Sequence, residues 1–187
     1  TLFRSLATSA TINNAQAVTV DKTGNLFIAD YYFYRIRKVG TNGLMTTVAG
    51  NPKAMQSGGF SGDGGQATNA AMGTPYDVAA DSLGNFYIAD YANSRIRKVD
   101  TDGIINTVIG GGVGSADGLQ GTNTYLPSPV AAAVDSHNNL YVTSNGRVRK
   151  MDTDGVMTTV AGGGNNDPGD YGPATSARFG SPMGLTF

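Results

Sequence analysis

The sequence predicts an all-β protein built from repeated, four-stranded antiparallel units, and three observations support this. One stretch occurs three times, at 35–50, 95–110 and 147–162, with the pattern Arg-x-Arg-Lys-x-x-Thr-x-Gly-x-x-x-Thr-Val-x-Gly. Each copy holds two runs rich in β-branched residues, joined by Asn-Gly or Asp-Gly, which supplies the positive φ angles of a tight hairpin. The copies begin at residues 35, 95 and 147, spacings of 60 and 52 residues, which indicates a repeat array.

Around each hairpin, the pattern predicts two further short strands and therefore a four-stranded meander. In each unit, a strand of small and β-branched residues leads through an Asp-initiated turn to a second strand and a loop. The expected first strands are 16–20, 76–80 and 130–134, and the expected second strands are 26–29, 86–89 and 140–143. The full units are thus about 16–50, 76–110 and 130–162.

Both ends of the chain resemble parts of further units. Residues 8–12 match residues 68–72 and 175–179, so we expect 1–15 to be the tail of a preceding unit. Residues 1–6 are expected to form an outer strand left over from that unit, and 183–187 match only a first strand. We therefore expect three full units with partial ones at 1–15 and 183–187, all within a single domain over 1–187.

The first strand of each unit is dominated by Ala, Val and Gly, whereas the second carries Phe, Tyr, Leu and Ile. This gradient fits radial packing, in which the innermost strands crowd around an axis and bulkier residues fill the space between blades. We therefore predict a β-propeller, with Val18, Val78 and Val134 on the innermost strands.

Composition excludes several partners. The chain has 13 Lys and Arg against 14 acidic residues, for a net charge of −1, so we expect no nucleic acid or anionic membrane as its main partner. No apolar run approaches the roughly 20 residues of a membrane-spanning helix, so no membrane insertion is expected. There is no Cys, which excludes disulfides and thiolate metal sites.

The motifs resemble a known family. Residues 80–110 contain three motifs in fixed order: Ala-Asp-x-x-Gly-Asn-Phe-Tyr-Ile-Ala-Asp, then Arg-Ile-Arg-Lys-Val, then Thr-x-Gly-Ile. Together they resemble the repeats of the NHL-repeat β-propellers. The insert Gly59-Phe-Ser-Gly-Asp-Gly-Gly-Gln-Ala-Thr68 resembles a connection common in bacterial, often secreted, members. The resemblance implies four-stranded antiparallel blades in a ring of roughly six, and an extracellular location, either secreted or at the cell surface.

The residues predict no enzyme, metal or cofactor. Propeller lyases similar to this family use several His ligands around zinc, and the chain has one His, His137, expected to be a solvated turn residue. Other propeller enzymes use an axial Glu, and all 14 acidic residues here are Asp. Asp167 and Asp170 are the best candidates for calcium, but an Asp beside Gly is also what a tight turn requires. We therefore expect no catalytic and no metal-binding residue.

One feature is not explained by the repeat. The loop of the first unit reads Tyr31-Tyr-Phe-Tyr34, where the second has Tyr91-Ala-Asn-Ser94, and clustered exposed aromatics mark binding surfaces. Packing against a long connection is the alternative. Tyr76 and Asp77 begin an inner strand near the expected axis. The predicted binding residues are Tyr31, Tyr32, Tyr34, Tyr76, Asp77 and Tyr91.

The repeated Asp30 and Asp90 are expected to bond backbone amides of the loop that follows each, helped by Asn93. The repeated Arg pairs share one face of a strand and are expected to contact acidic groups on a neighbouring blade or the solvent.

Three functions remain open. The first is a non-catalytic extracellular scaffold that binds a protein or glycan. The second is a structural subunit that self-associates through incomplete blade edges, although a simple dimer would leave one shared blade without its middle strands. The third is part of a propeller lyase or hydrolase whose catalytic residues lie in other blades.

Overall fold

The structure is a computed structural model that describes residues 5–51, 53, 59–166 and 169–187. It is all-β, with three antiparallel sheets that follow one another along the chain. Each sheet contains a four-stranded meander, and short 3-10 helices lie between the strands. In the described residues, no helix is long and apolar enough to cross a membrane.

The first sheet has the strand order β1-β5-β4-β3-β2. Its strands are β1 (Ser5–Leu6), β2 (Ala15–Val20), β3 (Leu26–Asp30), β4 (Arg35–Val39) and β5 (Leu44–Ala49). The second sheet has the order β6-β10-β9-β8-β7. Its strands are β6 (Gly65–Gln66), β7 (Pro75–Ala80), β8 (Phe86–Asp90), β9 (Arg95–Val99) and β10 (Ile104–Gly110).

The third sheet has the order β11-β12-β13-β14. Its strands are β11 (Ala131–Val134), β12 (Leu140–Ser144), β13 (Arg147–Met151) and β14 (Met157–Gly162). The 3-10 helices are η1 (Ala7–Ser9), η2 (Tyr31–Phe33), η3 (Ala67–Asn69), η4 (Tyr91–Asn93), η5 (Gly121–Asn123) and η6 (Ala174–Ser176).

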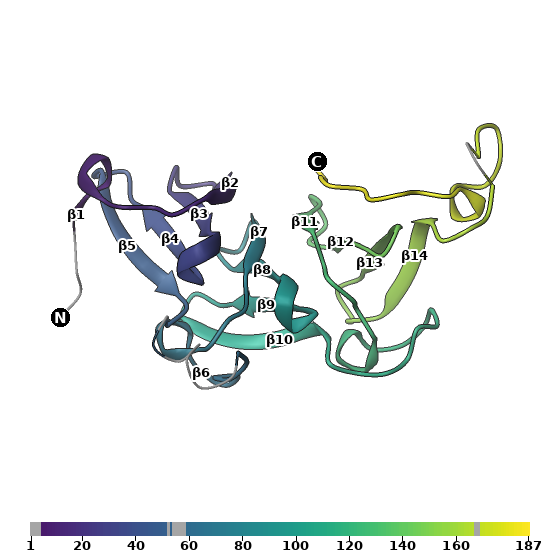
Figure 1. Ribbon diagram of the computed structural model, residues 1–187, viewed down its shortest axis with the longest axis horizontal. Helices are drawn as coiled ribbons and strands as arrows, with labels where there is room; N and C mark the ends of the chain where they lie inside the picture. The colour runs from purple at the N-terminus through teal and green to yellow at the C-terminus, as the bar shows by residue number, and fades with distance from the viewer. Residues whose placement is uncertain (1–4, 52, 54–58, 167–168) are drawn as a thin grey trace.

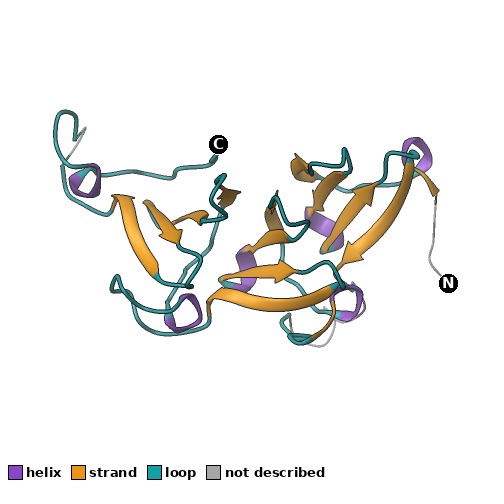
Figure 2. Ribbon diagram, turned by 180° about the vertical axis from the view of Figure 1, so that it is seen from behind, coloured by secondary structure: helices purple, strands orange, loops and turns teal. Residues whose placement is uncertain are grey.

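The three sheets stand side by side around an axis, with β5, β10 and β14 at the rim (Figure 1). The innermost strands β2, β7 and β11 pack against one another in sequence. Val18, Val78 and Val134 lie on these strands, as the small-residue gradient predicts. The same arc is seen from behind in Figure 2. This arrangement is consistent with part of a β-propeller.

Two apolar cores fill the spaces between the sheets. The first joins sheets one and two through Phe27, Phe86 and Ile88, and the second joins sheets two and three through Tyr87, Leu140 and Val142. Successive residues of a strand point to opposite faces, so β8 contributes Phe86 and Ile88 to one core and Tyr87 and Ala89 to the other. The bulky second strand therefore fills both interfaces.

The turns lie where the sequence predicts them, but the hairpin turns differ in backbone conformation. Asp21, Asp81 and Asp135 each accept hydrogen bonds from the amides two and four residues later, which fixes the first turn of every unit. In the hairpins, only the Gly of each Asn/Asp-Gly pair has a positive φ, 73° at Gly43 and 78° at Gly103. The hairpin is thus a four-residue turn closed by a left-handed Gly, not a two-residue turn with two positive φ angles.

The chain ends differ from expectation. Residues 5 and 6 pair with β5, at Ser5↔Met45 and Leu6↔Leu44, so they extend the first sheet and are not an outer strand of a preceding unit. The second sheet receives β6 in the same way. The third sheet has an equivalent bridge, Gln120↔Val156. At the other end, 183–187 form no strand, although the Phe187 ring lies 4.6 Å from that of Tyr141.

Candidate binding surface

Four tyrosines form a continuous row across the first two sheets. The ring centroids of Tyr32 and Tyr31 are 4.8 Å apart, those of Tyr31 and Tyr76 are 5.5 Å apart, and those of Tyr76 and Tyr91 are 4.6 Å apart. The first two contacts are edge-to-face, a favourable geometry for aromatic pairs. The structure thus brings together four of the six predicted site residues, from η2, the start of β7 and η4.

The row is open to solvent at one end and supported at the other. Tyr32 has 54% of its surface exposed, whereas Tyr31, Tyr76 and Tyr91 are half-buried. Tyr76 also packs against the core between sheets two and three. The alternative prediction, burial of the aromatics under a long connection, therefore does not describe Tyr32.

Tyr34 lies next to the row but does not extend it. It ends η2 in the left-handed conformation, with φ of 53°, and its amide donates to the carbonyl of Tyr31. Ser94 occupies the same position after η4, with φ of 55°. Tyr34 therefore has the local role of reversing the chain into β4. Non-Gly residues in this region are uncommon, so its equivalence to Ser94 marks it as part of the repeat.

Buried aspartates hold the loops that carry the row. Asp30 accepts a hydrogen bond from the amide of Asn13 at 2.9 Å and from Arg35 Nε at 3.3 Å. Asp90 accepts from the amide of Gly73 at 2.7 Å and from Asn93 Nδ2 at 2.9 Å. The amides belong to the segment before each inner strand and not to the loop that follows, which corrects that expectation. Asn93 helps as predicted.

Asp90 has a carboxyl group with a perturbed pKa. Its side chain is fully buried, and burial raises its pKa to about 6. Hydrogen bonds from Asn93 and Gly73, and the Arg97 guanidinium 3.7 Å away, favour the carboxylate and offset part of the cost of burial. The group is thus a structural anchor whose charge depends on pH.

Asp77 lies beside Tyr76 at the mouth of an axial cavity. The cavity, about 190 Å³, is lined by the starts of the inner strands and by the C-terminal segment, at Gln16, Ala17, Tyr76, Asp77, Val130, Met183, Gly184 and Leu185. The two carboxylate oxygens of Asp77 accept hydrogen bonds from the amides of Val78 and Ala132, both at 2.8 Å. Asp77 therefore ties β7 to β11, and its burial raises its pKa.

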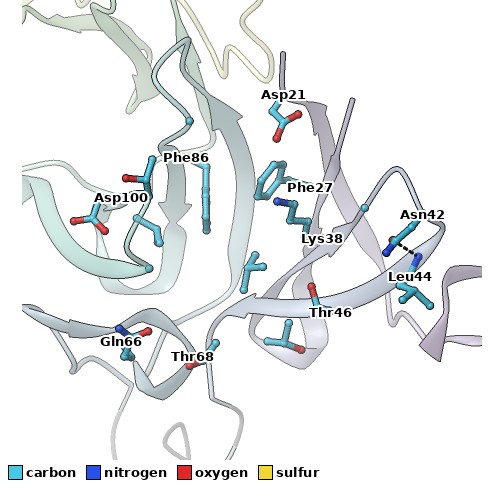
Figure 3. A pocket seen from close by; sticks show the side chains of 17 residues that line it. Asp21, Phe27, Lys38, Asn42, Leu44, Thr46, Gln66, Thr68, Phe86 and Asp100 are labelled. Carbon is cyan, nitrogen blue, oxygen red and sulfur yellow. Dashed lines mark hydrogen bonds between the residues drawn. The ribbon is translucent and has the colours of Figure 1, made fainter. Parts of the chain in front are cut away.

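A larger hollow, about 510 Å³, lies between the first two sheets at the end opposite the tyrosine row (Figure 3). Its floor is formed by Phe27 and Phe86, whose ring centroids are 4.9 Å apart. Lys38 lies with its ammonium 5.4 Å from the Phe27 ring, and Asp21 and Asp100 also line the hollow. This hollow was not among the predicted binding sites. The recurrence of Lys after the Arg pair is the signal that could have indicated it.

The same hollow recurs between sheets two and three, where it measures about 310 Å³. There Tyr87 stands in place of Phe27, and its hydroxyl donates to Asp81 at 3.2 Å. Lys98 and Asp152 take the places of Lys38 and Asp100. Since both hollows are lined by equivalent positions, the hollow follows from the repeat. The tyrosine row has no such copy, because the third unit has only Asn145-Gly146 in place of the loop.

The Arg pairs also have partners that sequence reasoning missed. Arg97 is fully buried and donates to the Asp63 carboxylate at 2.6 Å and the Ser61 carbonyl at 3.2 Å. The Phe60 ring lies 4.0 Å from the Arg95 guanidinium and 4.7 Å from that of Arg97. The acidic partner thus comes from the long connection and not from a neighbouring blade. The Gly62-Asp63-Gly64 segment of that connection is the sequence feature that could have indicated this acidic partner.

The acidic and histidine side chains are the possible metal ligands of the chain. Within the described residues, no group of three His, Cys, Asp or Glu side chains is placed to hold a metal ion. His137 is exposed in the turn between β11 and β12, where its amide donates to Asp135, as its sequence position predicts. Asp170 lies exposed in a turn, and Asp167 is outside the described residues.

Three antiparallel sheets that follow one another around one axis define the chain as a repeat protein of the propeller class. A family model described as the Teneurin NHL domain matches residues 58–116. The chain is 36% identical to Teneurin-1 of Mus musculus and 37% identical to Teneurin-4 of Homo sapiens, each over 107 residues. These matches cover 52% of this chain and 4% of each relative, so the chain spans a small share of those proteins.

Solved structures share the fold. A Bacteroides thetaiotaomicron protein described as being of unknown function aligns over 94% of this chain and 42% of its own, with 22% identity and a TM-score of 0.66. An auxiliary nutrient binding protein of the same organism aligns over 93% and 43%, with 18% identity and a TM-score of 0.63. A streptogramin B lyase aligns over 99% and 49%, with 11% identity and a TM-score of 0.61. The family-model match and the teneurin relatives support the resemblance to the NHL-repeat proteins.

Proposed function

We propose that the chain is a non-catalytic, extracellular binding propeller that presents the tyrosine row to a protein or glycan partner. The observation that carries the proposal is the row itself, Tyr32, Tyr31, Tyr76 and Tyr91, which spans two blades and which the repeat does not require. Aromatic side chains supply large contact area at small entropic cost, which is why they are enriched in binding surfaces.

The functions named for similar solved structures support a binding role. The solved neighbours include the auxiliary nutrient binding proteins of two Bacteroides species and a nidogen/laminin complex. The resemblance of the 59–68 connection to that of secreted bacterial members supports an extracellular and bacterial origin. We also propose that the three sheets form part of a ring of roughly six blades, as the family resemblance implies.

The lyase descriptions among the neighbours do not favour catalysis here. The streptogramin B lyase is 11% identical to this chain, a level at which the likeness concerns the fold alone. The only imidazole, that of His137, lies in an exposed turn at the end of the sheets opposite the tyrosine row.

Binding is tested with an oligosaccharide array and a panel of purified extracellular-matrix proteins, each probed with the 187-residue chain. The chain has no Trp and nine Tyr, of which four form the row, so a change of tyrosine fluorescence on binding is assigned to the row by comparison with the variant below. The triple variant Tyr31→Ser, Tyr32→Ser, Tyr91→Ser should lose at least tenfold in affinity for whichever probe binds. This loss corresponds to about 1.4 kcal/mol, within the range of a single hot-spot residue.

The matched control is Tyr125→Ser. Tyr125 is 54% exposed, as Tyr32 is, but makes no aromatic contact with the row among the described residues. Its replacement should leave affinity unchanged. Equal affinity of the triple variant and the parent chain for the bound probe would refute the row as the binding surface. A signal from sugars but not from proteins, or the reverse, decides the class of partner.

A further inference from the structure

The last residue of the second strand of each sheet lies opposite the first arginine of that sheet's Arg pair. The three cross-strand pairs are Asp30↔Arg35, Asp90↔Arg95 and Ser144↔Arg147. Asp30 and Asp90 are both fully buried, whereas the third unit has Ser144 in their place, 5% exposed. The third sheet therefore lacks a carboxylate that the first two sheets hold at this position.

In the second sheet, this carboxylate helps to neutralise a buried arginine. Arg97 has two carboxylates within 4.0 Å of its guanidinium, that of Asp63 at 2.6 Å and that of Asp90 at 3.7 Å. Arg149 is its equivalent in the third sheet. Among the described residues, Arg149 has one such partner, Asp117 at 3.2 Å. The Arg pair of the third sheet is thus one carboxylate short of the pair in the second.

The aspartate has a second role, accepting a backbone hydrogen bond, and the third unit replaces this role internally. The amide that donates to Asp90 is that of Gly73, which stands six residues after the start of η3. Pro127 stands six residues after the start of η5 and has no N–H to donate. The hydroxyl of Ser144 donates to the Pro127 carbonyl instead. The change from Asp to Ser therefore leaves no amide unpaired at this position, and only the arginines lose a partner.

A small cavity of about 70 Å³ lies at this position of the third sheet, where β12 ends and β13 begins (Figure 1). Its walls include Ser144, Arg147 and Arg149, together with Ser115 and Pro127 of the preceding connection. No acidic side chain of the described chain lines it. Arg149 is 4% exposed, so a group that enters the cavity meets two guanidinium side chains in a partly water-excluded site. Attraction between opposite charges is strong in such a site.

The cavity lies inside the third unit and not on an uncovered sheet face. In the second unit, the residue before the Arg pair is Ser94, whose hydroxyl accepts a hydrogen bond from the amide of Ser128 in the following connection at 3.4 Å. In the third unit, that residue is Gly146, and a Cβ there would lie 2.7 Å from the carbonyl oxygen of Phe179. The following connection therefore packs against the loop in both units.

We propose that this cavity receives the carboxylate of an Asp or Glu side chain of a protein partner. The incoming carboxylate would take the place that Asp30 and Asp90 fill in the other two sheets, so the chain itself supplies the template for the ligand. Guanidinium groups bind carboxylates through short, charge-assisted hydrogen bonds. The proposal rests on the binding function proposed above and specifies part of the partner's surface.

The size and position of the cavity favour an acidic side chain. A cavity of about 150 Å³ is known to hold one benzene ring. A cavity of about 70 Å³ thus admits a carboxylate at the end of a short chain but not a whole sugar ring. Asn145-Gly146 joins β12 to β13 as η2 and η4 join the equivalent strands, so the cavity opens at the same end of the sheets as the tyrosine row.

The test is an NMR titration of the isotope-labelled 187-residue chain with N-acetyl-L-aspartate N-methylamide. We expect amide shifts centred on 144–147 and 115–117 that saturate at millimolar probe, because only a few charge-assisted hydrogen bonds form. N-acetyl-L-asparagine N-methylamide has the same shape without the charge and should give no saturable shift. Equal binding of the two probes would overturn the proposal.

Three variants make the assignment specific. Arg147→Gln changes a half-buried side chain and should weaken the aspartate probe at least tenfold. The matched control Arg95→Gln makes the same change in the second sheet, where Asp90 already fills the position, and should leave the affinity unchanged. Ser144→Asp should abolish binding because its own carboxylate would fill the cavity, provided circular dichroism shows that it folds. If it does not fold, the comparison of Arg147→Gln with Arg95→Gln decides the question.

The probe needs no partner, so this site and the tyrosine row are tested separately. The triple variant Tyr31→Ser, Tyr32→Ser, Tyr91→Ser should bind the aspartate probe as the parent chain does. Shifts centred on the row, or equal affinity of Arg147→Gln and the parent chain, would refute the carboxylate site. Tighter binding of D-glucuronate than of the aspartate probe would overturn its assignment to an acidic side chain.

Discussion

At the scale of single residues, Asp90 makes the stability of the folded state depend on pH. Its pKa rises to about 6 because the carboxyl is fully buried, above the ordinary value of 3.8. The folded state therefore holds its proton more tightly than the unfolded state between about pH 4 and pH 6. Stability from this group is present below pH 4 and is lost as the pH rises through 6.

Replacement of Asp90 by Asn should remove this dependence. In the parent chain, the free energy of unfolding should fall by up to about 3 kcal/mol between pH 4 and pH 6 through Asp90, since each pKa unit is worth about 1.4 kcal/mol. In Asp90→Asn the fall should be smaller, with only Asp77 contributing in the same direction. Urea unfolding at the two pH values measures the difference. Identical slopes for the two chains would contradict the raised pKa.

A glycine at the end of each outer strand is required by a close approach. Gly50 has φ of 92°, and a Cβ there would lie 2.3 Å from the carbonyl oxygen of Tyr34. Gly43 in the hairpin has φ of 73° but open space around its Cβ position. Gly50→Ala should therefore cost about 3 kcal/mol or more, whereas Gly43→Ala should cost about 1 kcal/mol. Chemical denaturation compares the two, and equal losses would show that backbone conformation alone sets the cost.

At the scale of elements, the long connections are fastened by their acidic residues. Asp63→Asn should release the connection before η3 from Arg97 and lower stability by about 1–3 kcal/mol, because the buried guanidinium loses its shorter ion pair and keeps only Asp90 at 3.7 Å. Hydrogen exchange should increase in 59–66 while the strands of the first sheet keep their protection. Asp102→Asn, on the exposed hairpin turn of the same sheet, is the control. Unchanged exchange in 59–66 would show that the Asp63–Arg97 ion pair does not hold the connection.

The elements themselves were largely predictable. The Arg-x-Arg-Lys repeats, the Asn/Asp-Gly turns and the gradient from small to bulky strands depend on local spacing, and local spacing is what sequence shows. The partners of Arg97 and the contact of Tyr31 with Tyr76 depend on where a connection crosses a blade. Asp63 and Arg97 are separated by 34 positions, and no local pattern joins them. No local pattern shows that β1 pairs with β5 either, and the expectation that residues 1–6 belong to a preceding unit is therefore wrong for residues 5 and 6.

At the scale of the whole molecule, equivalent positions have unequal surroundings. Val78 is buried between two sheets and Val18 is not. Val78→Ala should therefore cost about 2 kcal/mol in the free energy of unfolding, while Val18→Ala should cost close to zero in dilute solution. A similar loss for both variants would contradict the exposed face.

The rim strands of the first two sheets are each covered by two residues that lie before them in the chain, β1 on β5 and β6 on β10, and the rim of the third by the single bridge Gln120↔Val156. This gives the molecule a mechanical polarity. Force applied to the C-terminus removes the last sheet and leaves every remaining rim covered. Force applied to the N-terminus strips each rim of its cover before that sheet comes apart, so the chain should unzip in smaller steps from that side.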